Sequence, residues 1–195
     1  MKSSYWKNNF GEVLFYTTIA FPPALAVELG VLEGFSSISI GKALCWISER
    51  KGICGHLHSY DLWEDYPHKH TTMEKTQETI NLCGIEDFVT LYKMDAYEVS
   101  KLYKDRTVDL LHVDISNDGE TFERILELWD PKMRHCGLIL FEGGSEERDN
   151  VEWMKKYNKK KIRPAMNGSR LLNENYIWGT YSAFPSLTVM KKVTL

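Results

Sequence analysis

Apolar residues in this chain form short runs, and several of the runs end at an acidic residue. In residues 24–40, ALAVELGVLEGFSSISI, such a run closes on Glu28 and then passes through Gly30 and Gly34 into a helix-like pattern. Glycine permits a sharp turn and a close approach of the backbone to a bulky ligand. The segment is therefore predicted to form a strand, a tight turn and a helix, and the turn is the first candidate for a ligand site.

The same arrangement recurs further along the chain. The predicted strands are residues 55–63, ending near Asp61; 88–93, ending before Asp95 and Ala96; 108–119, closing on Asp114; and 136–144, with Glu142 at the strand end. Helical spacing is found between them at residues 71–82 and 121–129. Alternating strands and helices predict an α/β fold with a parallel sheet. The acidic residues at the strand ends are then expected to lie along one edge of that sheet.

The commonest nucleotide-binding motifs do not fit the glycine turn. A dinucleotide fingerprint requires glycine at the position of Leu32, and a phosphate loop requires a Lys-Ser/Thr pair where Phe35 and Ser36 stand. Ser36 and Ser37 are instead candidate helix caps. A glycine turn after a strand also occurs for purely architectural reasons in α/β domains. The pattern alone therefore leaves open whether the turn binds a ligand or only shapes the fold.

The pattern that does fit is E-x-G-x-x-x-G-[FY]-S, which spans Glu28 to Ser36. With it the chain resembles the class I methyltransferases that use S-adenosylmethionine, in particular the branch of the macrocin and catechol O-methyltransferases. The resemblance extends from about Ala24 to the C-terminus. It implies an α/β, Rossmann-like fold with a seven-stranded, mostly parallel sheet in the order 3-2-1-4-5-7-6, with strand 7 antiparallel and helices on both faces.

The resemblance also assigns the C-terminal end of the chain, whereas the N-terminal end lies outside it. Residues 184–193, FPSLTVMKKV, resemble the final antiparallel strand of methyltransferase sheets. The neighbouring strand is then expected at residues 159–166, and an irregular connection at residues 167–181. Residues 1–23 show no clean hydrophobic period and are expected to form a short helical lid or packing arm. A strand in this segment is the alternative that the sequence leaves open. Residues 24–195 are expected to form the core of a single domain.

S-adenosylmethionine is the cofactor that the resemblance implies. Its amino-acid end is expected at the glycine turn, and its ribose at Asp61, where a carboxylate accepts hydrogen bonds from hydroxyl groups. Asp95 and Ala96 are expected beside the adenine, with Trp63 and Tyr66 as stacking residues or as a packed strand end. The predicted cofactor-binding residues are Glu28, Gly30, Gly34, Ser36, Asp61, Asp95, Ala96 and Asp114.

Asp114 and Asn117 are the catalytic candidates. Asp114 is expected to contact the ammonium group of the cofactor and to face the methyl acceptor, or else to cap the following turn. In catechol-type relatives a divalent metal, usually magnesium, is held by an Asp after the fourth strand and an Asp-Asn pair after the fifth, near a lysine base. By position, the metal candidates here are Asp114 and Glu142. Gly143 stands where these relatives have the Asn, and Asn117 stands where they have the lysine. A metal such as Mg²⁺ is therefore possible but not favoured, and without it the two carboxylates are expected to repel and to act as a base.

Composition restricts the partners and the location of the chain. The net charge of −3 over 195 residues argues against a general affinity for nucleic acid, while a local basic patch stays open. The four cysteines form no C-x-x-C pair, and neither a membrane span nor a secretory segment is found, so a cytoplasmic protein is expected. The basic run from Lys155 to Arg163 is expected to be a solvated helix end leading into an edge strand, with an acidic substrate as the alternative. Two His-x-His pairs lack the further ligands of a zinc site: His56 with His58, and His68 with His70.

The predicted activity is methyl transfer from S-adenosylmethionine to an oxygen atom of a small molecule or sugar. The competing hypothesis is a non-catalytic domain that binds S-adenosylmethionine or S-adenosylhomocysteine in a sensing or scaffolding role, which the departures at Asn117 and Gly143 favour. A nucleotide-dependent α/β enzyme is a third hypothesis, against which the missing phosphate motifs argue. The expected partner is a small-molecule acceptor, with no membrane.

Overall fold

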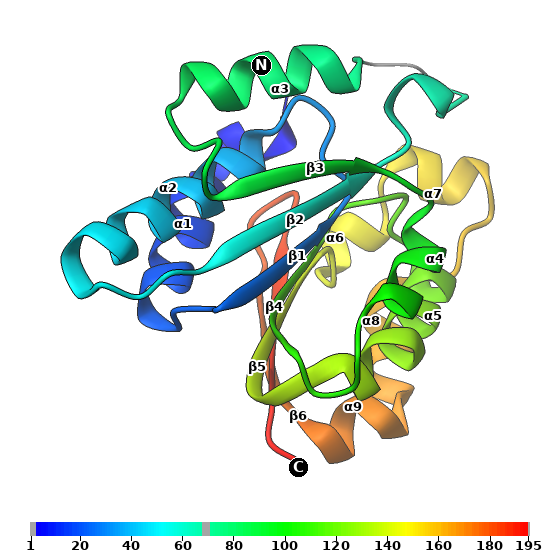
Figure 1. Ribbon diagram of the computed structural model, residues 1–195. Helices are drawn as coiled ribbons and strands as arrows, with labels where there is room; N and C mark the ends of the chain where they lie inside the picture. Colours follow the sequence, from blue (N-terminus) through cyan, green and yellow to red (C-terminus); the bar gives the residue numbers. More distant parts are fainter. Residues whose placement is uncertain (1–2, 68–70, 195) are drawn as a thin grey trace. The chain divides into compact units, whose positions relative to one another are not determined.

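Seven strands form the sheet in the computed structural model, which describes residues 3–67 and 71–194 (Figure 1). The strands are β1 (Leu25–Leu29), β2 (His56–Asp61), β3 (Val89–Lys93), β4 (Val108–Val113), β5 (Met133–Glu142), β6 (Tyr176–Tyr181) and β7 (Leu187–Lys192). Their order is β3-β2-β1-β4-β5-β7-β6, and β7 runs antiparallel to both β5 and β6. The β1–β2, β2–β3 and β4–β5 pairs are parallel. The predicted fold class, strand order and antiparallel last strand are confirmed.

Helices and short 3₁₀ turns connect the strands. Before β4 they are η1 (Ser4–Asn8), α1 (Phe10–Ala20), α2 (Phe35–Lys51), η2 (Trp63–Asp65), α3 (Met73–Leu82), α4 (Ala96–Val99) and η3 (Ser100–Leu102). After β4 they are α5 (Gly119–Trp129), η4 (Asp130–Lys132), α6 (Glu146–Asp149), α7 (Glu152–Lys156), α8 (Ile162–Gly168) and α9 (Arg170–Asn175). Among the described residues, no helix has the length and apolar character needed to cross a membrane.

The chain divides into two compact units, residues 1–99 and 100–195. The first unit contains β1, β2 and β3 with helices α1 to α4, and the second contains β4 to β7 with helices α5 to α9. That the chain acts as a single domain stays a prediction.

Residues 4–8 and 10–20 of the N-terminal arm are helical, as expected for the arm, and residues 1–2 lie outside the described residues. Helix α1 buries Phe10 and Leu14, because residues four apart lie on the same helix face. Figure 1 shows α1 beside α2, and the two helices approach closely at Gly11, where a Cβ would lie 2.9 Å from the Phe35 ring. The arm therefore packs against the helix that follows the glycine turn.

Helix α2 packs against β3 with little space between them. A Cβ on Gly41 would lie 2.7 Å from a methyl group of Val89 and 2.8 Å from one of Ile85. The apolar face of α2 includes Ile40 and Leu44, which are fully buried. This packing fixes the N-terminus of α2, and with it the glycine turn, relative to the strands of the first unit.

Strands β4 and β5 are the most deeply buried part of the second unit. In β4, Leu110, Leu111 and Val113 are at most 1% exposed, and residues 138–141 of β5 are at most 2% exposed. Continuous apolar runs are typical of strands covered on both faces, which is why the sequence predicted them correctly. Their carboxyl ends carry Asp114 and Glu142, as predicted.

The prediction for the segment before β7 is wrong. Residues 159–166 do not form a strand, and residues 167–181 are not irregular, since they contain α9 and β6. Residues from Ile162 onward form α8, whose first amides are held by the Asp149 carboxylate: Ile162 N donates to Oδ1 at 2.6 Å and Arg163 N to Oδ2 at 2.8 Å. This cap comes from outside the helix and 13 residues away in the chain, so it leaves no local signal in the sequence. The strand beside β7 is β6, whose aromatic and β-branched residues favour extended structure.

Candidate functional site

The predicted glycine turn follows β1 and leads directly into α2. Gly30, Leu32 and Gly34 have φ angles of 87°, 54° and 86°, in the left-handed region that glycine adopts without strain. Gly34 is the N-cap of α2, and no side chain caps the helix, so the prediction that Ser36 and Ser37 are caps is wrong. Uncapped amides at a helix N-terminus favour binding of a carboxylate or phosphate group.

Asp61, the last residue of β2, holds this turn in place from the neighbouring strand. Its Oδ2 accepts hydrogen bonds from Val31 N at 2.7 Å and Leu32 N at 2.9 Å, and its Oδ1 accepts one from Trp63 N at 2.9 Å. A carboxylate offers about four lone-pair positions, so these bonds leave room for about one further donor. The structure thus gives Asp61 a turn-holding role that the sequence did not predict, while its contact with a ribose stays a prediction.

Glu28 is completely buried at the carboxyl end of β1 and binds side chains from two other elements. Ser37 of α2 and Ser59 of β2 both donate to Glu28 Oε2, and the Ser59 bond measures 2.7 Å. A buried carboxylate is costly to desolvate unless polar groups compensate it. Ser37 therefore serves Glu28 rather than the helix N-terminus, and the three side chains join β1, β2 and α2 beside the turn. Ser36 is also buried, in the first turn of α2.

Trp63 belongs to the packed end of β2, the second of its two predicted roles. It is 2% exposed, and its indole N–H donates to Thr76 Oγ1 at 3.2 Å and to Leu32 O at 3.3 Å. Both partners are fixed parts of the first unit. The indole ring therefore connects the glycine turn to α3, and it is not an exposed surface on which a ligand could stack.

The carboxyl end of β3 carries the two residues predicted beside adenine. Asp95 is exposed and accepts a hydrogen bond from Tyr97 N at 2.9 Å at the start of α4, and Ala96 is half-buried. Nearby, Lys93 Nζ lies 2.7 Å from Glu64 Oε1. This hydrogen bond, and then those from backbone amides including that of Met73, lower the pKa of Glu64 to about 2. The pair ties β3 to the turn after β2. Adenine contact at Asp95 and Ala96 stays a prediction.

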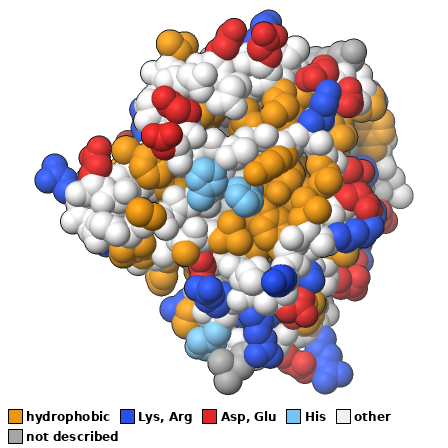
Figure 2. All heavy atoms as spheres, viewed as in Figure 1, with side chains coloured by type: hydrophobic (Ala, Val, Ile, Leu, Met, Phe, Trp, Pro, Cys, Tyr) orange, Lys and Arg blue, Asp and Glu red, His pale blue; other side chains and the backbone are white. Residues whose placement is uncertain are grey.

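The described histidine pair lies on β2 and is partly accessible. The rings of His56 and His58 are 5.5 Å apart, His56 Nε2 lies 2.8 Å from Thr90 Oγ1, and Figure 2 shows histidines gathered on the face it presents. Burial, and then the neighbouring His56, lowers the pKa of His58. Within residues 3–67 and 71–194, no three His, Cys, Asp or Glu side chains are grouped to hold a metal. The second predicted pair, His68 and His70, lies outside the described residues.

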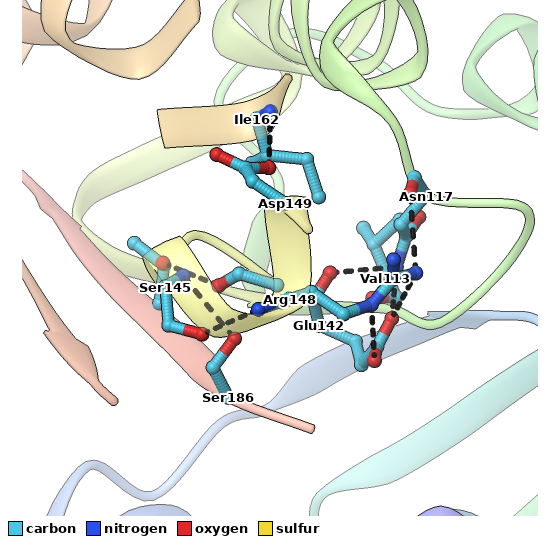
Figure 3. A network of polar contacts seen from close by, with 10 residues as sticks. Val113, Asn117, Glu142, Ser145, Arg148, Asp149, Ile162 and Ser186 are labelled. Carbon is cyan, nitrogen blue, oxygen red and sulfur yellow. Dashed lines mark hydrogen bonds and ion pairs between the residues drawn. The ribbon is translucent and has the colours of Figure 1, made fainter. Parts of the chain in front are cut away.

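A buried polar network lies at the carboxyl end of β5 in the second unit (Figure 3). Glu142 is 5% exposed, and its carboxylate is bound by the Arg148 guanidinium: Nε lies 3.2 Å from Oε1, and Nη2 lies 3.4 Å from Oε2. Asn117 Nδ2 adds hydrogen bonds to Glu142 O at 2.9 Å and to Oε2 at 3.3 Å. The expectation that Glu142 is half of a carboxylate pair without a cation is therefore wrong. Arg148 is absent from the predicted site, because an arginine six residues after a strand end is no recognised signal.

Two polar atoms of this network are buried without a hydrogen-bond partner among the described residues: Arg148 Nη1 and Asn117 Oδ1. An unsatisfied buried polar atom costs about 1–3 kcal/mol, so such atoms are rare in native proteins. One is a donor and the other an acceptor. Together they are complementary to a group that both accepts and donates, such as a hydroxyl group or a water molecule.

The residues around Glu142 do not fit a divalent metal. Both of its carboxylate oxygens already accept hydrogen bonds from Arg148 or Asn117. The next residue, Gly143, has a φ of 121°, and a Cβ there would lie 2.5 Å from Ile162 Cδ1, so a longer ligand side chain has no space. Mg²⁺ binds about six oxygen ligands in a nearly octahedral arrangement. We therefore derive no chemical step through a metal at Glu142.

Asp118, and not Asp114, caps the helix after β4. Asp118 Oδ1 accepts a hydrogen bond from Thr121 N at 2.8 Å, and its Oδ2 lies 2.8 Å from Lys159 Nζ. Burial alone would raise the pKa of Asp118, but the Lys159 ammonium and the Thr121 amide outweigh it and leave the pKa below its ordinary value. Asp114 is half-buried directly after β4. A cap by Asp114 on the turn that directly follows it stays a prediction. Lys155 and Lys156 are exposed in the last turn of α7, as expected for a solvated helix end, whereas Lys159 binds the N-cap of α5.

An Asp118→Ala variant is expected to lose about 1–2 kcal/mol of unfolding free energy, since it lacks both the cap and the ion pair. Asp118→Asn is the matched control, because it keeps the capping oxygen and loses only the charge, and it should retain most of the stability. The depressed pKa stabilises the parent above the unfolded-state pKa of about 4, and this contribution disappears as pH falls through the folded-state pKa. Urea denaturation at pH 7 and pH 3 measures both effects. Equal stabilities of Asp118→Ala and the parent at pH 7 would contradict the assignment.

The chain was compared with protein families, curated proteins and solved structures. A sequence profile described as a methyltransferase domain matches residues 27–142, which is more than half of the chain. No curated protein matches the chain. A methyltransferase from Geobacter sulfurreducens is similar in structure, with 15% identity, a TM-score of 0.68, and coverage of 96% of this chain and 79% of that one.

Two further structures of the same fold contain bound adenosyl compounds. PaMTH1, a methyltransferase from Podospora anserina solved with S-adenosylhomocysteine, has 13% identity and a TM-score of 0.65 over 100% of this chain and 80% of its own. TomG is an O-methyltransferase of tomaymycin synthesis from Streptomyces achromogenes, solved with S-adenosylmethionine. It has 14% identity and a TM-score of 0.64, and the match covers 95% of this chain and 80% of TomG. Identities this low show a common fold and leave the substrate open.

Proposed function

The chain belongs to the methyltransferase-domain family, and from this premise we propose that it transfers a methyl group from S-adenosylmethionine to an oxygen atom of a small molecule or sugar. The observation that carries the proposal is the glycine turn, with an uncapped helix N-terminus and a carboxylate from β2 holding its amides. The adenosyl compounds in PaMTH1 and TomG support the choice of cofactor.

Most of the proposed cofactor residues lie at the glycine turn and at the carboxyl ends of β1, β2 and β3. The uncapped first turn of α2 fits the carboxylate of the amino-acid end, because free amides and the helix dipole favour an anion there. Asp61 has about one lone pair left for a ribose hydroxyl after binding the turn. The full proposed set is Glu28, Gly30, Gly34, Ser36, Asp61, Asp95 and Ala96, to which Asp114 is added for the ammonium group.

The proposed acceptor residues follow strand β4. When bound, the cofactor provides an electrophilic methyl group, so the chain has to orient the acceptor oxygen and hold or remove its proton. We propose Asp114 for this contact, because it directly follows the buried strand β4 and is itself half-buried. Asn117 is completely buried, and its Nδ2 donates to Val113 O and Glu142 O. We therefore propose that Asn117 positions the turn after β4.

Titration of the parent protein with S-adenosylhomocysteine tests the proposal. We expect one molecule to bind per chain and to raise the melting temperature, because a ligand that binds only the folded state stabilises it. Gly34→Ala should weaken binding about tenfold, since its φ of 86° strains an alanine in the turn and the added Cβ would lie 3.2 Å from Thr76 Cγ2.

Gly84→Ala is the matched control for this experiment. It places an alanine at a similar φ of 64°, but its Cβ would meet nothing within 4 Å. It should cost comparable backbone strain and leave the affinity for S-adenosylhomocysteine unchanged. No binding to the parent, or equal weakening by both substitutions, would refute the assignment of the turn. Binding without methyl transfer to any hydroxylated acceptor would favour the sensing alternative.

A further inference from the structure

We propose that Arg148 is a built-in cation that stands where a metal would be needed beside Glu142, and that from there it positions the turn after β4. Arg148 is thus a positioning residue. The inference rests on the proposed function for the meaning of this strand end as an acceptor site. Its test, however, measures metal binding and needs no methyl transfer.

The first argument is that one guanidinium covers the whole Glu142 carboxylate. Arg148 Nε and Nη2 approach the two oxygens separately, at 3.2 Å and 3.4 Å, and Nη2 also donates to Asn117 O at 3.2 Å. Planar, two-pronged contact of this kind is what a guanidinium offers a carboxylate and an ammonium cannot. A divalent cation would have to displace the guanidinium to reach the same oxygens.

The second argument is that Arg148 is held rigidly where it stands. Arg148 is 6% exposed, and its guanidinium carbon lies 5.0 Å from the centre of the Trp153 ring. Its backbone N–H donates to Ser145 Oγ at 3.1 Å at the start of α6. The next residue, Asp149, binds the first amides of α8. Short helix α6 is therefore anchored on both sides, and Arg148 is a fixed part of the second unit.

The third argument concerns the two buried polar atoms of the network that have no hydrogen-bond partner among the described residues. The unpartnered atoms are Arg148 Nη1, a donor, and Asn117 Oδ1, an acceptor. A metal ion accepts no hydrogen bond from an N–H group, whereas a hydroxyl group or a water molecule can satisfy both atoms. At the adjacent Gly143, Ile162 fills the space in which a further ligand would have to lie. The network thus suits a protic group and excludes a coordination shell.

The test is the binding of Mn²⁺ to the chelator-stripped protein, followed by electron paramagnetic resonance of the free ion. We expect the parent to leave the free Mn²⁺ signal unchanged, and Mg²⁺ or Mn²⁺ to leave its melting temperature unchanged. Arg148→Ala is expected to bind about one Mn²⁺ per chain, because the Glu142 carboxylate then lacks the guanidinium that covers it. Adding Glu142→Gln to that variant should abolish the binding.

Arg163→Ala is the matched control. The Arg163 guanidinium carbon also lies over a tryptophan, 5.1 Å from the centre of the Trp178 ring, but its Nη1 donates to neutral oxygens, Gly144 O and Thr180 Oγ1. It should gain no Mn²⁺ binding. Binding of Mn²⁺ to the parent that Asp114→Asn removes would overturn the proposal, and so would a folded Arg148→Ala that binds none. If Arg148→Ala does not fold, Mn²⁺ binding to the parent and to Asp114→Asn decides whether the proposal holds. S-adenosylhomocysteine titrated in parallel shows separately whether the proposed function fails.

Discussion

An Arg148→Met variant is expected to lose about 3–5 kcal/mol of unfolding free energy, the largest stability effect that the structure predicts. Arg148 and Glu142 are both buried, and the guanidinium is the cation that balances the carboxylate. Without it, a desolvated negative charge remains in the second unit, and the amide of Asn117 compensates only part of the cost. Urea denaturation followed by circular dichroism measures the loss.

The double variant Glu142→Gln with Arg148→Met identifies the cause of that loss. Replacing both members of a buried ion pair is often nearly neutral, so the double variant should recover most of the stability that the single variant loses. Arg134→Met is a surface control: Arg134 is 54% exposed in its pair with Asp109, and its loss should cost at most about 1 kcal/mol. If the double variant were as unstable as Arg148→Met, the pair would not be the source of the effect.

The second large effect is expected on cofactor affinity. Asp61→Ala should weaken the binding of S-adenosylhomocysteine by about 1.5–3 kcal/mol, roughly tenfold to a hundredfold, because it removes a charged acceptor of hydrogen bonds. The structure adds a cause beyond the ribose, since the amides of Val31 and Leu32 lose the carboxylate that fixes the glycine turn. Calorimetric titration of the folded variant measures the change.

Two controls separate the causes at Asp61. Asp61→Asn keeps one oxygen for the turn amides and loses the charge, so its affinity should lie between those of the parent and the alanine variant. Asp105→Ala removes an exposed carboxylate that pairs with Lys132 in the second unit, and it should leave the affinity unchanged. An unchanged affinity in folded Asp61→Ala would contradict both the ribose contact and the importance of the turn.

The sequence by itself determined strands β1 to β5, the acidic residues at the carboxyl ends of β1, β2, β4 and β5, and the glycine turn, but not strand β6. These features follow from local chemistry: a strand buried on both faces requires a continuous apolar run, as in residues 108–113, and the turn requires glycine at Gly30 and Gly34. The resemblance built on them supplied the sheet order, which the structure confirms.

The tertiary structure alone decided which partners these residues have. Asp61 holds amides 29 and 30 positions away, Ser37 turns back to Glu28 instead of capping its helix, and Asp149 caps α8 across a gap of 13 residues. None of these contacts leaves a local pattern, because each joins elements that meet only after folding. The ion pair of Glu142 with Arg148 is the clearest case. The composition of a strand end predicts that a carboxylate is there, but only the fold decides which cation lies close enough to neutralise it.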